Sequence, residues 1–307
     1  MYRHDLPQLT GAVFLTDSGL ETDLVFNHGV DLPEFAAFPL IDDATGRDLL
    51  QRYFADHVAI ATDHHAGIVL EAPTWRASSG WGARLGYDSA ALRRANRDCV
   101  DLVAGVRAHA SVPVVVSAAI GPEGDGYRPS RYLTTEEART YHAPQLESLA
   151  GTEADMAHAM TMTYVDEAVG IVEAAAEVKL PIAISFTVET DGALPDGTTL
   201  AAAIRGVDDA TGGAPAYYGI NCAHPTHFAA VLDAGAEWTA RLRCIRANAS
   251  AIRHAELDEA EELDAGNPIE LASEYAAMRD RHRGLTVLGG CCGTDTRHVQ
   301  AIADRCL

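Results

Sequence analysis

The feature that most constrains the fold is a repeated alternation of short apolar segments with longer, alanine-rich amphipathic segments along the chain. Most of the short segments are apolar at consecutive positions, which is typical of strands that are buried on both faces of a parallel sheet. We expect strands at Val13–Thr16, Gly67–Leu70, Val112–Ala118, Asp155–Ala159, Ile182–Val188, Tyr217–Asn221, Leu242–Ala247 and Thr286–Leu288. We expect helices at Thr45–Thr62, Ser89–Ala110, Thr134–Ala150, Tyr164–Val178, Leu200–Arg205, Pro225–Asp233, Pro268–Arg283 and Asp295–Arg305.

Eight strand–helix units in 307 residues match a (β/α)8 TIM barrel. No stretch rich in Ser, Gly and Pro divides the chain, so we predict a single domain over residues 1–307. A doubly wound open sheet is the alternative, but no GxGxxG follows the first predicted strand.

The charge of the chain narrows the classes of partner. A formal net charge of -21 argues against nucleic acid and against an anionic membrane surface. No apolar run reaches the length of a membrane span, and no apolar leader follows Met1. We therefore expect a cytoplasmic protein in a reducing compartment. The densest acidic run, at residues 256–264, is expected to be a solvated face.

Three cysteines fall at the ends of two predicted strands. Cys291 and Cys292 lie in the sequence GGCCGT at 289–294, and Cys222 follows the strand that ends at Asn221. In a barrel these strand ends share one face with the turn at 17–22 after the first strand. Three thiolates can bind zinc and leave the fourth position open for a substrate. Buried core cysteines, a disulfide between neighbours and a redox pair are the alternatives.

These motifs together resemble the homocysteine S-methyltransferase family, and the resemblance runs essentially from end to end. Besides GGCCGT and Asn221-Cys222, the chain has Asp17-Ser18-Gly19 with Thr22 where the family has Asp-Gly-Gly and Thr. It also has Thr74-Trp75-Arg76-Ala77-Ser78 for the family element Thr-x-x-Ala-Ser. The resemblance implies a TIM barrel with zinc on Cys222, Cys291 and Cys292.

The resemblance also implies an activity. A small-molecule thiol acceptor, homocysteine, would bind zinc through sulfur and be held as a thiolate that attacks a methyl group on a cationic donor, giving methionine. Betaine, S-methylmethionine, S-adenosylmethionine and methylfolate are donors in the wider family. Because the chain ends soon after the eighth helix, we expect no appended cobalamin or folate module, which favours the small sulfonium donors. A homodimer is compatible with the sequence.

The chain departs from the family at the residue that holds the substrate amine. The family has Glu-Thr or Glu-Tyr at the end of the fourth strand, whereas this chain has Met160-Thr161. A methionine cannot pair with an ammonium group. We hypothesise that Glu71, after the second strand, or Glu189, after the fifth, replaces the missing Glu.

The full set of expected substrate-binding residues follows from the motifs and from this departure. Asn221 is expected to orient the zinc site through a hydrogen bond. Asp17 matches the acid that contacts the substrate amine in the family. The set is Asp17, Glu21, Glu71, Thr74, Glu189 and Asn221. Transfer involving a different small thiol, a non-catalytic zinc-binding barrel and a cysteine redox protein with a Cys291–Cys292 disulfide are the rival interpretations.

Overall fold

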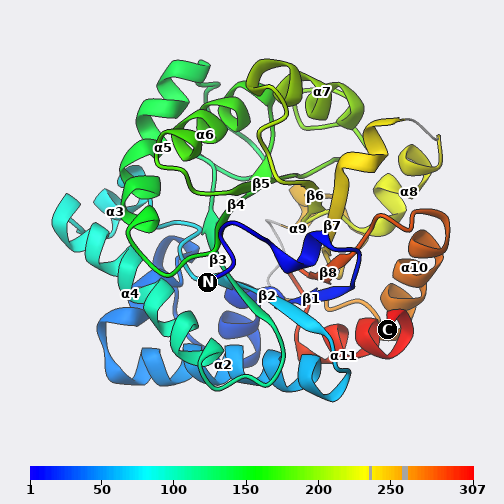
Figure 1. Ribbon diagram of the computed structural model, residues 1–307, viewed down its shortest axis with the longest axis horizontal. Coiled ribbons are helices and arrows are strands. Elements are labelled where there is room, and N and C mark those ends of the chain that lie inside the picture. The colour runs from blue at the N-terminus through cyan, green and yellow to red at the C-terminus, as the bar shows by residue number, and fades with distance from the viewer. Residues whose placement is uncertain (235–236, 258–261) are drawn as a thin grey trace.

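The computed structural model describes residues 1–234, 237–257 and 262–307, and within them eight parallel strands close into a barrel in sequence order (Figure 1). This confirms the predicted TIM barrel. The strands are β1 (Phe14–Thr16), β2 (Gly67–Ala72), β3 (Val114–Ile120), β4 (Met156–Met162), β5 (Ile182–Phe186), β6 (Tyr218–Asn221), β7 (Leu242–Ala247) and β8 (Val287–Gly290).

Helices surround the barrel and cover the outer face of its sheet (Figure 1). The eight predicted helices are present as α2 (Ala44–Asp63), α4 (Ser89–Arg107), α5 (Thr135–Ala150), α6 (Val165–Glu177), α7 (Leu200–Thr211), α8 (Pro225–Asp233), α10 (Pro268–Arg281) and α11 (Thr296–Cys306). Three short helices were not predicted: α1 (Leu20–Thr22), α3 (Ser79–Arg84) and α9 (His254–Leu257). Each has six or fewer residues, too few to show a helical period.

Four strands extend further toward the barrel mouth than predicted. β2 continues through Glu71 to Ala72, β3 to Ile120, β4 to Met162 and β8 to Gly290. The polar Glu71 breaks the apolar run, but its backbone still pairs with Ser117 of β3. Backbone hydrogen bonds between strands therefore continue through polar residues near the mouth, and the apolar pattern of the sequence does not reveal this.

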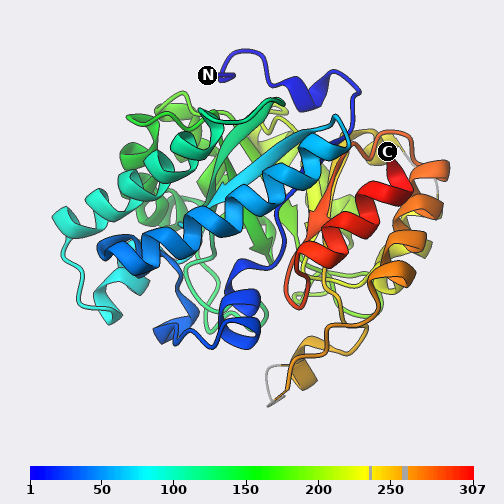
Figure 2. The same ribbon diagram turned by 90° about the horizontal axis from the view of Figure 1, so that it is seen from below.

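The barrel interior is packed at the end opposite the mouth. Phe14, Met156, Tyr217 and Val287 belong to an apolar cluster there that also includes Leu6 of the N-terminal segment. Figure 2 shows this segment at the end of the barrel opposite to α1 and α9. The second, larger cluster lies between the sheet and the helices. One end of the barrel is therefore filled, and the other is left for polar residues.

The sequence led to two expectations about the outside of the protein: no membrane-spanning segment, and a solvated acidic run at residues 256–264. No described helix combines the length and the hydrophobicity needed to cross a membrane. In the acidic run at 256–264, the residues at 258–261 lie outside the described part of the chain.

The buried Tyr275 of α10 ties β7 to β8 where these strands reach the mouth. Its hydroxyl accepts a hydrogen bond from the backbone N–H of Ala247 at 2.7 Å and donates one to the carbonyl of Gly289 at 2.6 Å. Tyr275→Phe leaves both backbone groups buried without this partner. We expect its free energy of unfolding in urea to fall by about 1–3 kcal/mol. Tyr132→Phe, at an exposed tyrosine, is the control, and equal values for the two variants would contradict this role.

Candidate metal centre and cavity

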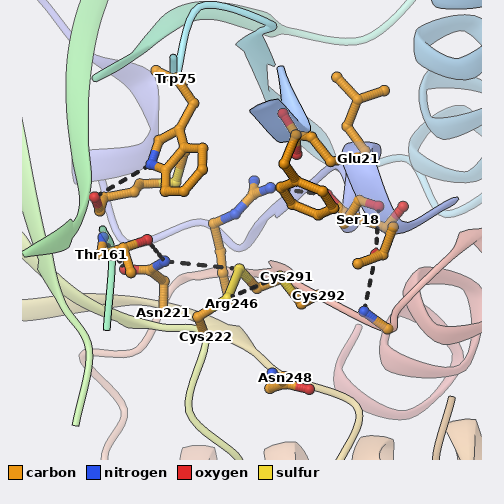
Figure 3. A pocket seen from close by; sticks show the side chains of 18 of the residues that line it. Ser18, Glu21, Trp75, Thr161, Asn221, Cys222, Arg246, Asn248, Cys291 and Cys292 are labelled. Carbon is orange, nitrogen blue, oxygen red and sulfur yellow. Dashed lines mark hydrogen bonds between the residues drawn. A yellow bond between two sulfur atoms is a disulfide. The ribbon is translucent and has the colours of Figure 1, made fainter. Parts of the chain in front are cut away.

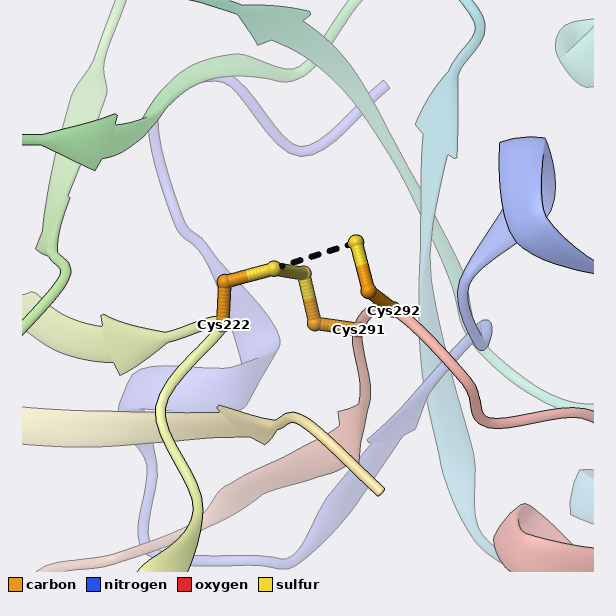
Figure 4. Close-up of side chains that lie close together, drawn as sticks. All are labelled: Cys222, Cys291 and Cys292. Carbon is orange, nitrogen blue, oxygen red and sulfur yellow. Dashed lines mark hydrogen bonds between the residues drawn. A yellow bond between two sulfur atoms is a disulfide. The ribbon is translucent and has the colours of Figure 1, made fainter. Parts of the chain in front are cut away.

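Three cysteine sulfurs meet at the mouth of the barrel (Figure 4). Cys222 directly follows β6, and Cys291 and Cys292 directly follow β8. The three Sγ atoms all lie within 4.8 Å of one another. The structure has a disulfide between Cys222 and Cys291, rather than between the neighbours Cys291 and Cys292, and the Sγ atoms of Cys222 and Cys292 are 3.3 Å apart. Residues 69 positions apart are thus brought to one point by the barrel.

The loop that carries Cys291 and Cys292 is held by its backbone. The N–H of Cys291 donates to the carbonyl of Ala247 at 2.8 Å, and the carbonyl of Cys292 accepts from Ala249 at 3.0 Å. Gly293 has φ of +77°, a conformation that favours glycine. Gly19 lies so close to the carbonyl of Cys291 that a side chain would collide with it. These glycines explain why the motif turns tightly enough to present both thiols.

Asn221 links the cysteines to the end of β4. Its side-chain oxygen accepts from the N–H of Thr161 at 2.7 Å, and its amide nitrogen donates to the Thr161 hydroxyl at 2.9 Å and to Cys291 Sγ at 3.7 Å (Figure 3). Thr161 and Cys222 both have positive φ, of 63° and 56°, which is uncommon for residues with a side chain. Asn221 therefore holds a strained segment and orients one sulfur, as a residue supporting a metal ligand would.

A cavity of about 400 Å³ lies in front of the sulfurs. Four of the expected substrate-binding residues line it together with the three cysteines: Asp17, Glu21, Glu71 and Asn221. Thr74 and Glu189 are not among the lining residues. Thr74 is fully buried, and its hydroxyl donates to the carbonyl of Ala119 at 2.8 Å. Glu189 lies on the loop after β5, where its N–H donates to the carbonyl of Ala193.

A buried ion pair forms part of the cavity wall. The guanidinium of Arg246, on β7, donates to Asp17 Oδ1 at 2.8 Å and to the carbonyl of Ser18 at 3.1 Å. Burial on its own would lower the pKa of Arg246, but the carboxylates of Asp17 and Glu71 raise it above its ordinary value. Arg246 thus stays charged and fixes the turn after β1 against β7.

A second buried chain of polar groups crosses the inside of the barrel. Glu71 Oε1 lies 2.8 Å from His158 Nδ1 of β4, and His158 Nε2 lies 2.7 Å from Ser185 Oγ of β5. The other carboxylate oxygen of Glu71, Oε2, is buried and has no hydrogen bond among the described residues. Burial on its own would raise the pKa of Glu71, but the charge and hydrogen bond of His158, together with Arg246 and the nearby hydroxyl of Ser117, lower it. Glu71 is therefore an ionised carboxylate whose second oxygen is buried and lacks a hydrogen bond of normal geometry among the described residues.

Met160 also lines the cavity, as expected from the departure at this position. Its backbone carbonyl accepts a long hydrogen bond, 3.5 Å, from the indole N–H of Trp75. Its apolar side chain gives this part of the wall no charge.

The donor set fits zinc. Zinc–sulfur bonds are about 2.3 Å long, so sulfurs in a tetrahedral site lie about 3.8 Å apart. Three sulfurs already within 4.8 Å of one another need only small side-chain rotations to reach this spacing. Because thiolates and not disulfide sulfurs bind metal, the Cys222–Cys291 bond must be reduced for the site to form.

The sequence contained signals for two residues that were not singled out. Arg246 is a cation in the otherwise apolar end of the strand Leu242–Ala247, and His158 is a polar residue in the apolar strand Asp155–Ala159. A charged or titratable residue inside a strand buried on both faces needs a partner, which indicates a site. Their partners, Asp17 just after β1 and Glu71 on β2, follow only from the closed barrel.

The family model described as homocysteine S-methyltransferase matches residues 14–306, nearly the whole chain. The chain belongs to the homocysteine S-methyltransferase family. Among curated proteins it is similar to homocysteine S-methyltransferase YbgG of Bacillus subtilis, with 27% identity over 198 residues. That match spans 62% of this chain and 60% of the relative.

Solved structures of another family member share the fold. The oxidized form of the Escherichia coli homocysteine methyltransferase MmuM superimposes with a TM-score of 0.77 at 21% identity, over 95% of this chain and 96% of that chain. Its metallated form gives a TM-score of 0.74 at 19% identity, with the same coverage. At these identities the structural similarity establishes the barrel fold alone.

Glu21 gives this cavity a testable pH dependence. Burial raises the pKa of Glu21 to about 7, against the lowering effects of a backbone hydrogen bond and of Arg76. A carboxyl group with a raised folded-state pKa binds its proton more tightly when folded, so stability is lost as the pH rises from about 4.5 to about 7. Glu21→Gln removes this loss.

We expect Glu21→Gln and the parent protein to unfold alike at or below pH 4.5. At pH 8 the variant should be more stable by about 1–2 kcal/mol, because it no longer has to bury an ionised carboxyl group on folding. The gain is smaller than the full pKa shift would give, because Glu21 keeps some contact with the cavity. Urea unfolding of the reduced proteins across this pH range measures the difference. Glu147→Gln, at an exposed position of α5, is the control for loss of a carboxyl group outside the cavity. A Glu21 difference that remains at zero up to pH 8 would refute the assignment.

Proposed function

We propose that this protein is a zinc-dependent S-methyltransferase that transfers a methyl group from a small cationic donor to homocysteine, forming methionine. The observation that carries the proposal is the group of three cysteine sulfurs beside a cavity with carboxylates in its wall. Zinc bound there would lower the pKa of a substrate thiol and hold its sulfur as the nucleophile. A reducing compartment such as the cytoplasm would keep the three ligands as thiols.

Glu71 is the carboxylate best placed to replace the family's amine-binding Glu. It lines the cavity, it is held by His158, and its Oε2 has no hydrogen bond among the described residues. A substrate ammonium group would supply the missing partner and offset the cost of burying the carboxylate. Glu189 does not line the cavity, so we assign the role to Glu71 with Asp17 nearby. Asp17 Oδ1 already receives hydrogen bonds from Arg246 and, at 3.4 Å, from the N–H of Glu71.

The remaining wall favours a cationic methyl donor. Asp17, Glu21 and Glu71 line the cavity together with Arg76 and Arg246, and three thiolates around a divalent zinc ion would leave a net negative centre beside the reacting methyl group. Such a site attracts sulfonium or ammonium donors such as S-methylmethionine, S-adenosylmethionine or betaine. The protein's part in the reaction is to hold donor and acceptor in line for methyl transfer.

The test is a homocysteine titration of cobalt-substituted protein, followed by thiolate-to-metal absorption. We expect a saturable change that is lost in Cys222→Ala, because removal of one of three ligands disrupts the metal centre. A response to another small thiol and none to homocysteine would mean a different acceptor. No response to any thiol would contradict the methyltransferase and leave a non-catalytic zinc site or a redox centre.

The same titration tests Glu71 against Glu189. Glu71→Gln should weaken homocysteine binding by about 10-fold or more, the value of a charge-assisted hydrogen bond. Glu189→Gln is the matched control and should bind homocysteine as the parent does. Mercaptobutyrate, which lacks the amine, should bind to the Glu71→Gln variant and to the parent equally well. Equal binding of homocysteine to Glu71→Gln and the parent would remove Glu71 from the site.

A further inference from the structure

A second arginine that lines the cavity, Arg76, has no part in the function proposed so far. It lies between β2 and α3 and lines the cavity. The guanidinium carbon is 3.6 Å from the ring centroid of Trp81 and 4.8 Å from that of Trp75. These two indoles limit the movement of the guanidinium through cation–π contacts.

The guanidinium of Arg76 lacks hydrogen-bond acceptors. Nε and Nη1 are both shielded from solvent and have no hydrogen bond among the described residues. The carboxylates of Asp125, Glu21 and Glu34 are near enough to influence its charge, but none of them forms an ion pair with it. Burying such donors without acceptors is costly.

Two other arginines of the same region have hydrogen-bond acceptors for their guanidinium groups. Arg246 donates to Asp17 and to the carbonyl of Ser18. Arg84, which stacks on Trp81 at 4.5 Å, donates to Glu34 at 3.4 Å. Arg76 differs from both because its N–H groups have no protein acceptor in the described chain while the side chain borders a cavity.

We propose that Arg76 binds the carboxylate of a substrate in this cavity. Stacking occupies the faces of a guanidinium and leaves its N–H edge for hydrogen bonds, and that edge matches a carboxylate with two parallel bonds. Arg76 is one of the residues that line the cavity, so a ligand there can approach this edge. The inference rests on the proposed methyl transfer: Glu71 pairs with a positive group of the substrate, and Arg76 with a negative one.

The carboxylate can belong to the thiol acceptor or to the methyl donor. Both classes of molecule exist with and without this group. Homocysteine and mercaptobutyrate carry it, whereas aminopropanethiol does not. S-methylmethionine carries it, whereas trimethylsulfonium does not. The site therefore selects zwitterionic or anionic ligands over purely cationic ones.

Binding of these ligands to the full-length, metal-loaded protein can be followed by tryptophan fluorescence. Trp75 and Trp81 are two of the three tryptophans of the chain, and both contact Arg76. The acceptor pair is homocysteine and aminopropanethiol, and the donor pair is S-methylmethionine and trimethylsulfonium. In one of these pairs, Arg76→Gln should weaken binding of the ligand with a carboxylate by about 10- to 100-fold. The affinity for the ligand without a carboxylate in that pair should change by no more than about twofold. Arg76→Lys should restore part of the affinity, since it keeps the charge without the planar fork.

Arg84→Gln is the matched control, since it removes a guanidinium from the same indole without altering the cavity wall. Arg84→Gln should leave the affinity for every ligand of both pairs unchanged. The pair that responds to Arg76→Gln identifies which substrate supplies the carboxylate. Equal losses within both pairs, no loss in either pair, or no binding of any carboxylate ligand to the parent would overturn the assignment. Failure of the thiol-binding metal centre on which the proposed function depends would be seen separately, as the absence of a thiol response in the cobalt absorption.

Discussion

The lateral pairing of β6, β7 and β8 is the constraint on which the rest of the site depends. Asn221 of β6 pairs with Arg246 of β7, and Ala247 pairs with Gly290 of β8. This register places the next residues, Cys222 and Cys291, with Cα atoms 5.3 Å apart. A shift of one residue would turn one of the thiols out of the barrel. The backbone hydrogen bonds of these strands, and Tyr275 behind them, therefore determine whether three sulfurs can share a metal.

Charged side chains inside the barrel form ion pairs, but some of their polar atoms lack a hydrogen-bond partner among the described residues. Asp17 is paired with Arg246, and Glu71 is paired with His158 through one oxygen. The second oxygen of Glu71 and the guanidinium of Arg76 have no hydrogen bond in the described part of the chain. Buried groups of opposite sign that lack partners are costly, and a ligand that carries both charges would offset that cost. This is the physical basis of the proposals for Glu71 and Arg76.

The barrel and the cysteine cluster were predictable for local reasons. Apolar runs alternating with amphipathic segments are visible residue by residue, and Cys222 and the Cys291-Cys292 pair each end such a run. Which of Glu71 and Glu189 lines the cavity was not predictable, because both follow a predicted strand and only the tilt and closure of the barrel decide which side chain reaches it. The pairing of Glu71 with His158 joins residues 87 positions apart on strands that are not neighbours. Arg76 could be seen in the sequence, but the lack of acceptors for its N–H groups depends on the whole cavity.

Zinc X-ray absorption on the reduced, zinc-loaded protein, with and without homocysteine, tests the open metal position most directly. We expect three sulfur neighbours and one lighter atom around zinc in the free protein. With homocysteine we expect four sulfurs at about 2.3 Å. Four sulfurs before any substrate is added would mean a closed structural site, and a shell that homocysteine leaves unchanged would contradict the claim that the open position receives the acceptor thiol.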